Sequence, residues 1–140
     1  MDRLQFFGVL TSSTCVLCGT SVETHDHLFF QCRFSAAVWG SLSTKTHTSW
    51  PSTSWVPLLQ WACTHLHRRK DYRHLISRLV LSATVYFLWY ERNNRIFSRR
   101  HRSTRDIIGD ISELIRSRLL GLETRLQIPV LQRHIWRLST

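Results

Sequence analysis

Hydrophobic positions are most regular in the second half of the chain. Between Asp71 and Ser98 they recur at intervals of three and four residues, the period of one face of an α-helix. The pattern predicts a helix over residues 71–98, with Asp71 suited to its N-terminus. The expected buried stripe comprises Tyr72, Leu75, Ile76, Leu79, Val80, Ala83, Tyr86, Phe87 and Tyr90.

A second helix of the same period is predicted to begin near Ser103. Ser103 followed by Asp106 resembles a capping box, with Asp in place of the usual Glu. The apolar residues of the expected stripe are Ile107, Ile111, Leu114, Ile115, Leu119 and Leu122.

Weaker patterns lie before these helices. Residues 27–43 permit a helix whose phase is not clean, and residues 55–66 fit a short helix that tolerates Pro57 in its first turn. The Ser/Thr-rich stretch 43–54, which contains Pro51, predicts a mobile loop.

The two ends of the chain are less regular. Residues 1–10 predict the end of a helix closed by Gly8, followed by a short extended stretch. The tail 127–140 is mixed, and Trp136 is expected to tuck against the body. The prediction is a mainly α fold of one domain, in which an N-terminal loop or hairpin precedes a three- to four-helix assembly.

Composition adds a strong positive charge to this picture. The 19 basic residues, almost all of them Arg, exceed the 9 acidic ones and give a net charge of +10. Because the planar guanidinium matches phosphate oxygens and stacks on bases, this excess favours RNA or DNA as a partner. A solvated basic surface without a partner is the plainer interpretation.

No targeting or membrane segment is recognisable. The most apolar stretch, residues 80–90, is much shorter than the ~20 residues that a membrane span needs. We therefore expect no membrane partner and an intracellular protein of the nucleus or cytoplasm that is not secreted. Four cysteines in such a protein indicate metal ligands or free thiols before disulfides.

Three of the cysteines and one histidine form a metal-binding pattern. Two residues separate Cys15 from Cys18, eight separate Cys18 from His27, and four separate His27 from Cys32. Three thiolates and one imidazole are a closed tetrahedral set for zinc, which leaves no position for a reacting water. The pattern predicts one structural Zn²⁺.

Alternatives to this ligand set remain open at this point. His25 competes with His27, which is favoured because Leu28 and Phe29 would anchor it to the core. A disulfide pair or scattered buried thiols would also use these cysteines. Cys63 lies among apolar residues of a predicted helix and is expected to be a buried free thiol.

The N-terminal third resembles a known family. The zinc-binding domain at the C-terminal end of plant non-LTR (LINE-type) retrotransposon reverse transcriptases shares its pattern, and the segment WYERNNRIF at residues 89–97 is similar to a helix ending downstream in that family. The resemblance implies that Cys15, Cys18, His27 and Cys32 are zinc ligands, in a region thought to help the enzyme engage RNA or DNA. The positions of this sequence that resemble the family are Asp2-Arg3-Leu4, Gly8, Cys15, Cys18, Glu23-Thr24, His27–Phe30, Cys32, Ser35 and Val38-Trp39.

The sequence also departs from the family. The apolar segment that precedes Asp2 in longer relatives is absent, as is the polymerase with its metal-binding Asp-Asp pair. We therefore expect an N-terminally truncated fragment without enzymatic activity or a small-molecule substrate. The predicted organisation is a zinc-binding segment at 1–43, a loop at 44–54, a helical region at 55–126 and a tail at 127–140.

Two groups of cations are candidate phosphate contacts. Cations before and after the predicted helix 71–98 could each contact phosphates, although cations also suit a solvated helix C-terminus. The candidates are Arg68, Arg69, Lys70, Arg92, Arg95, Arg99, Arg100 and Arg102, of which Arg92, Arg95, Arg99 and Arg102 would share one helix face. Trp50 and Trp55 could stack on bases or close the core. The alternative function is a module that docks on a reverse transcriptase body without contacting nucleic acid.

Overall fold

The chain folds into helices. The computed structural model describes residues 14–51, 54–122 and 125–138, so the expectations for residues 1–10 lie outside it. In these ranges an isolated bridge between Thr14 and Val22 is the only β-pairing, and the predicted mainly α class is confirmed. The elements are η1 (His27–Gln31, a π-helix), α2 (Arg33–Ser43), η2 (Thr44–Thr46, a 3₁₀ helix), α3 (Trp55–His65), α4 (Tyr72–Phe97), α5 (Thr104–Leu122) and α6 (Val130–Ile135).

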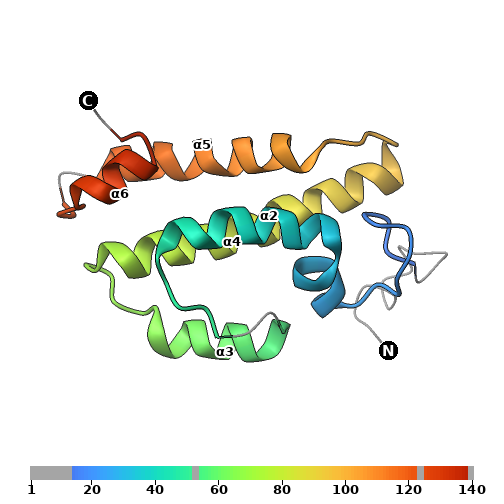
Figure 1. The fold of residues 1–140 in the computed structure, drawn as a ribbon, viewed down its shortest axis with the longest axis horizontal. Coiled ribbons are helices and arrows are strands. Elements are labelled where there is room, and N and C mark those ends of the chain that lie inside the picture. The colour runs from blue at the N-terminus through green and yellow to red at the C-terminus, as the bar shows by residue number, and fades with distance from the viewer. Residues whose placement is uncertain (1–13, 52–53, 123–124, 139–140) are drawn as a thin grey trace.

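Three helices form the body of the molecule. Helices α2, α4 and α5 pack against one another, with α3 along one side and α6 beside the C-terminal end of α5 (Figure 1). The segment before η1 lies at the end of the molecule where α4 ends and α5 begins. The α3–α4 and α5–α6 connections lie at the opposite end (Figure 1).

The two strongest helix predictions are confirmed, including their starts. The Asp71 carboxylate accepts a hydrogen bond from the Arg73 amide at 2.9 Å and so caps α4. At the start of α5, the Asp106 amide donates to Ser103 Oγ at 3.1 Å and the Ser103 amide donates to Asp106 Oδ2 at 3.3 Å. These reciprocal bonds make the expected capping box.

The buried face of α4 differs from the predicted stripe. Tyr86 and Tyr90 are 61% and 54% exposed, whereas Thr84 and Glu91 are buried. A long helix that packs against different neighbours along its length presents different faces to them, so a single apolar stripe does not describe its contacts. Leu114 of α5 is likewise 39% exposed.

The predicted helix at 27–43 is interrupted. Cys32 adopts an extended conformation (φ −61°, ψ 133°) between η1 and α2, which explains the unclear phase of the sequence pattern. In the stretch that follows, for which the sequence predicts a mobile loop, Thr44–Thr46 form η2 and several side chains have defined contacts. Thr46 is buried and accepts a hydrogen bond from Trp50 Nε1 at 3.0 Å, and Thr48 Oγ1 lies 2.6 Å from Ser77 Oγ.

The tail contributes to the core. Trp136 is 3% exposed, as expected, and its Nε1 donates to Gln132 Oε1 at 3.1 Å. Leu138 is fully buried. Across the described part of the chain, no helix combines the length and hydropathy that crossing a membrane requires.

Candidate functional site

A tight turn presents Cys15 and Cys18. The Gly19 amide donates to the Cys15 carbonyl at 2.7 Å, and the Cys15 amide donates to the Ser21 carbonyl at 2.8 Å. Gly19 has φ +72°, a left-handed conformation that glycine adopts without steric cost. This reversal brings the two thiols to one side of the turn.

A π-turn presents the other two residues. The Cys32 amide donates to the His27 carbonyl at 2.7 Å, a bond between residues five apart that is characteristic of a π-helix. Four intervening residues therefore place His27 and Cys32 on the same side of η1. Thr24 fixes the start of this turn, because its Oγ1 accepts a hydrogen bond from the His27 amide at 3.0 Å.

The four side chains meet in one cluster. Their donor atoms all lie within 4.8 Å of one another, and Cys15 and Cys32 are fully buried. Cys15 Sγ lies 3.9 Å from Cys32 Sγ, and Cys18 Sγ lies 3.3 Å from His27 Nε2. Tetrahedral zinc with ordinary bond lengths requires separations of about 3.8 Å between sulfurs and about 3.6 Å between sulfur and nitrogen. The residues therefore fit one structural zinc ion.

The competing residues lie elsewhere. His25 stacks on the Trp55 ring, with centroids 5.5 Å apart, and is not in the cluster. The prediction of Cys63 as a buried thiol is wrong: Cys63 is exposed, because it lies on the outer side of the short helix α3. Within the described residues, the Cys₃His group is the one set of three or more His, Cys, Asp or Glu side chains close enough for a metal.

Comparison with protein families supports this assignment. Residues 1–39 match the family described as zinc-binding in reverse transcriptase, and all four clustered residues fall inside the match. Residues 1–39 are a zinc-binding domain of the reverse-transcriptase type. No catalytic domain is matched, and no curated protein or solved structure matches the chain.

The thiols of this zinc-binding domain differ in acidity when no metal is bound. A hydrogen bond from Cys15 Sγ, supported by the Phe34 and Ser35 amides at the start of α2, lowers the pKa of Cys32 to about 5. The same shared proton and burial raise the pKa of Cys15. Burial opposes ionisation of Cys18, but hydrogen bonds from Thr20 and His27 outweigh it and lower its pKa to about 7.

These shifts predict how zinc binding depends on pH. Near pH 7 the metal-free cluster keeps a proton on Cys15 that zinc must displace, so we expect zinc affinity to rise with pH. The Cys15 proton alone corresponds to about a tenfold gain in affinity per pH unit. Cys18, whose pKa is about 7, adds a second displaced proton below pH 7, so the gain per pH unit should be larger near pH 6 than near pH 8. Chelator competition between pH 6 and 8 measures this slope, and an affinity independent of pH would contradict the shared-proton arrangement.

Arg92, predicted as a phosphate contact, is instead an internal ion-pair residue. Its side chain is 0% exposed, and its Nε lies 2.5 Å from Glu23 Oε1 in the zinc-binding domain. Its guanidinium also lies 4.7 Å from the Trp89 ring centroid. This residue therefore attaches the zinc-binding domain to α4 and has no exposed group for a phosphate.

Arg95 has a similar internal role. Its Nε lies 2.7 Å from Glu91 Oε2, and its Nη1 donates to the Leu17 carbonyl, between the two cysteines, at 3.3 Å. Its side chain is 10% exposed. Both sides of these attachments fall in segments that resemble the family, Glu23-Thr24 and residues 89–97, but no sequence pattern indicated that they pair.

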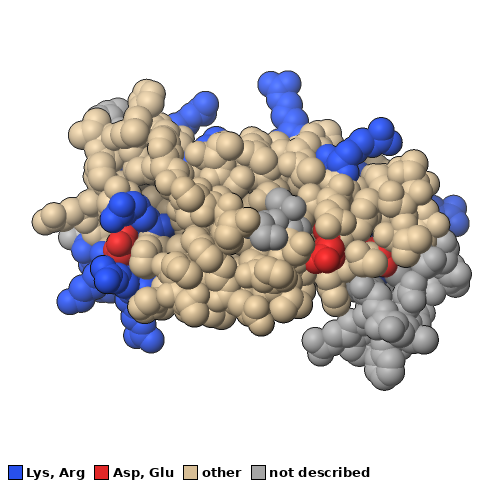
Figure 2. Space-filling view, turned by 60° about the horizontal axis from the view of Figure 1, so that its bottom comes forward, with Lys and Arg blue, Asp and Glu red and all other residues tan. Residues whose placement is uncertain are grey.

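The remaining candidate cations lie on the surface. Arg68, Arg69 and Lys70 are exposed before α4, and Arg99 and Arg100 are exposed after it. The expected shared helix face is wrong, because α4 ends at Phe97 and Arg99 adopts φ +52°. Arg102 Nη1 lies 2.6 Å from Asp110 Oδ2. Basic side chains gather at the left end of the face in Figure 2.

The two candidate tryptophans pack against the core. Trp50 lies edge-on to Trp39, with centroids 4.8 Å apart, and Trp55 stacks on Phe29 at 4.7 Å. Both rings therefore have internal aromatic partners, which agrees with the second of the two roles expected from the sequence, closing the core.

Proposed function

We propose that the chain is a nucleic-acid-binding module in which the zinc-binding domain is structural. The proposal rests on one observation: some of the candidate basic residues are internal, whereas others are exposed to solvent. Arg92 and Arg95 hold the zinc-binding domain on α4, whereas Arg68, Arg69, Lys70, Arg99 and Arg100 remain exposed. Exposed cations on a chain of net charge +10 suit the phosphates of RNA or DNA.

The zinc site supports a non-catalytic role. Three thiolates and one imidazole complete a tetrahedral shell, so the ion would stabilise the fold rather than activate a substrate. The proposal therefore includes no polymerase activity for this chain. It also includes an origin in a plant LINE-type element and a location in the nucleus or cytoplasm, where thiols stay reduced.

Salt-dependent binding tests the proposal. We expect the purified zinc-loaded chain to bind fluorescein-labelled RNA or DNA in anisotropy titrations. The logarithm of affinity should fall linearly with log salt, with a slope of about −2 to −4 for three to five phosphate contacts on a single strand. Absence of binding to RNA, single-stranded DNA and duplex DNA at 50 mM salt would contradict the proposal.

A second candidate function rests on an apolar groove of about 890 Å³ between α3 and α4. Phe29, Trp55, Leu59, Val85 and Tyr86 are among the residues that line it. Such a surface suits a protein partner, here the reverse transcriptase body that these domains follow in the family. Self-association that nucleic acid does not relieve would favour this function over the first.

A further inference from the structure

A basic pocket lies between two connections that are distant in sequence. Its volume is about 550 Å³. The two connections that line it lie at the end of the molecule opposite the segment before η1 (Figure 1). The α3–α4 connection and the start of α4 supply Arg68, Lys70, Tyr72 and Arg73, and the α5–α6 connection supplies Arg125 and Gln127.

The pocket keeps a net positive charge. The side chains of Arg68, Lys70 and Arg125 form no salt bridge with other described residues. Among the described residues, Asp71 is the one carboxylate that lines the pocket, and it already has partners. It accepts a hydrogen bond from the Arg73 amide, and its oxygens lie 3.6 Å from Arg73 Nε and 3.8 Å from His74 Nε2. The unpaired cations therefore favour an anionic ligand.

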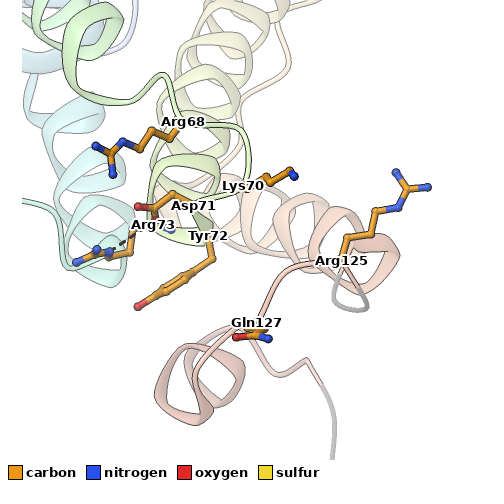
Figure 3. Close-up of a pocket in the computed structure, with 7 residues that line it drawn as sticks. All are labelled: Arg68, Lys70, Asp71, Tyr72, Arg73, Arg125 and Gln127. Carbon is orange, nitrogen blue, oxygen red and sulfur yellow. Dashed lines mark hydrogen bonds and ion pairs between the residues drawn. The ribbon is translucent and has the colours of Figure 1, made fainter.

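The lining residues offer more than charge. Figure 3 shows Arg68, Arg73 and the Tyr72 ring on one side of the pocket and Arg125 on the other, with Gln127 below and between them. The half-buried Tyr72 ring can stack on a base, and the Gln127 amide can both donate to and accept from a base edge. The Arg73 guanidinium lies 5.9 Å from the centroid of the Tyr72 ring. A basic groove that includes an aromatic side chain is the arrangement used by proteins that bind single strands.

We infer that this pocket binds a single-stranded polynucleotide, with phosphates on the cations at its two sides and a base against Tyr72. The inference rests on the proposed nucleic-acid function and assigns its site. RNA and single-stranded DNA share the phosphodiester and base chemistry that the pocket recognises. Arg125 is essential to the assignment, because it supplies the cation on the side opposite Arg68 and Arg73.

Two matched triple variants of the full chain test the site. The pocket variant combines Arg68→Gln, Lys70→Gln and Arg125→Gln. The control combines Arg33→Gln, Arg105→Gln and Arg137→Gln, which removes three exposed cations from outside the pocket. Fluorescence anisotropy measures the affinity of each variant for three labelled ligands. These are a 20-nucleotide RNA, a single DNA strand of the same sequence, and the corresponding DNA duplex. Both variants lose three positive charges, so a difference between their affinities shows where on the surface the nucleic acid binds.

We expect the pocket variant to bind single strands at least about tenfold more weakly than the control, with a salt slope shallower by about 2. Tyr72→Leu should weaken single-strand binding more than duplex binding, because it removes the stacking surface. Equal affinities for the RNA and DNA strands would show that the pocket recognises the phosphodiester and base groups that both share. A higher affinity for RNA would identify its 2′-hydroxyl as an added contact.

Other results would overturn the inference. If both triple variants bind equally well, nucleic acid binds elsewhere and only the site assignment fails. Tighter binding of duplex than of single strands, or displacement of RNA by polyglutamate at equal charge, would show a general polyanion surface. If the parent chain binds no nucleic acid, the proposed function fails together with its site.

Discussion

Loss of one zinc ligand is expected to open the zinc-binding domain and to leave the helical body folded. In the zinc-loaded chain, the Gly19 amide should be protected from hydrogen exchange by its bond to the Cys15 carbonyl. Cys15→Ser should remove the bound zinc and most of this protection. Amides in the middle of α4, such as that of Val80, should exchange as in the parent chain.

The expected loss of protection is large because few other contacts hold the segment before η1. Apart from its cysteines, the described stretch before η1 buries one apolar side chain, Leu17, which is worth about 1.5–3 kcal/mol. Apparent binding energies of structural zinc sites are about 10–16 kcal/mol, so the metal is the dominant contribution there. Phe29 and Phe30 also pack in the core, so η1 should be less affected than the turn at Gly19.

Cys63→Ser is the matched control. Cys63 is exposed and lies outside the cluster, so its replacement should preserve one zinc per chain by native mass spectrometry. Equal protection of the Gly19 amide in Cys15→Ser and in the parent chain would show that zinc does not hold this segment.

Arg92→Met is expected to lower the free energy of unfolding by about 3–5 kcal/mol, because it leaves the buried Glu23 carboxylate without its partner. Both side chains are fully buried. Among the described residues, Glu23 Oε2 and Arg92 Nη2 have no hydrogen-bond partner, so loss of one member would leave the other with even fewer bonds. Denaturant titration of the zinc-loaded chain measures the change.

Arg102→Met provides the comparison. Arg102 and Asp110 are 38% and 46% exposed, so breaking their ion pair should cost about 0–1 kcal/mol. The double variant Glu23→Met with Arg92→Met should recover much of the lost stability, because no unpaired buried charge remains. A similar cost for Arg92→Met and Arg102→Met would contradict the internal role of Arg92.

Local signals in the sequence predicted the parts of the fold that depend on neighbouring residues. Helices α4 and α5 were recognisable because their capping residues, Asp71 and Ser103, act within one turn. The buried line of α5 at Ile107, Ile111 and Ile115 follows from helical periodicity alone. The extended break at Cys32 was not recognisable, because metal-site geometry overrides helix propensity there.

The sequence by itself determined the zinc ligands, whereas the tertiary structure decided what the arginines do. Cys15, Cys18, His27 and Cys32 lie on two short turns, so their spacing carries most of the site's geometry. An Arg at a helix end looks the same in sequence whether it faces solvent or a buried carboxylate. Only packing paired Arg92 with Glu23, which is distant in sequence, and brought Arg125 beside Lys70, because these approaches depend on how the helices dock.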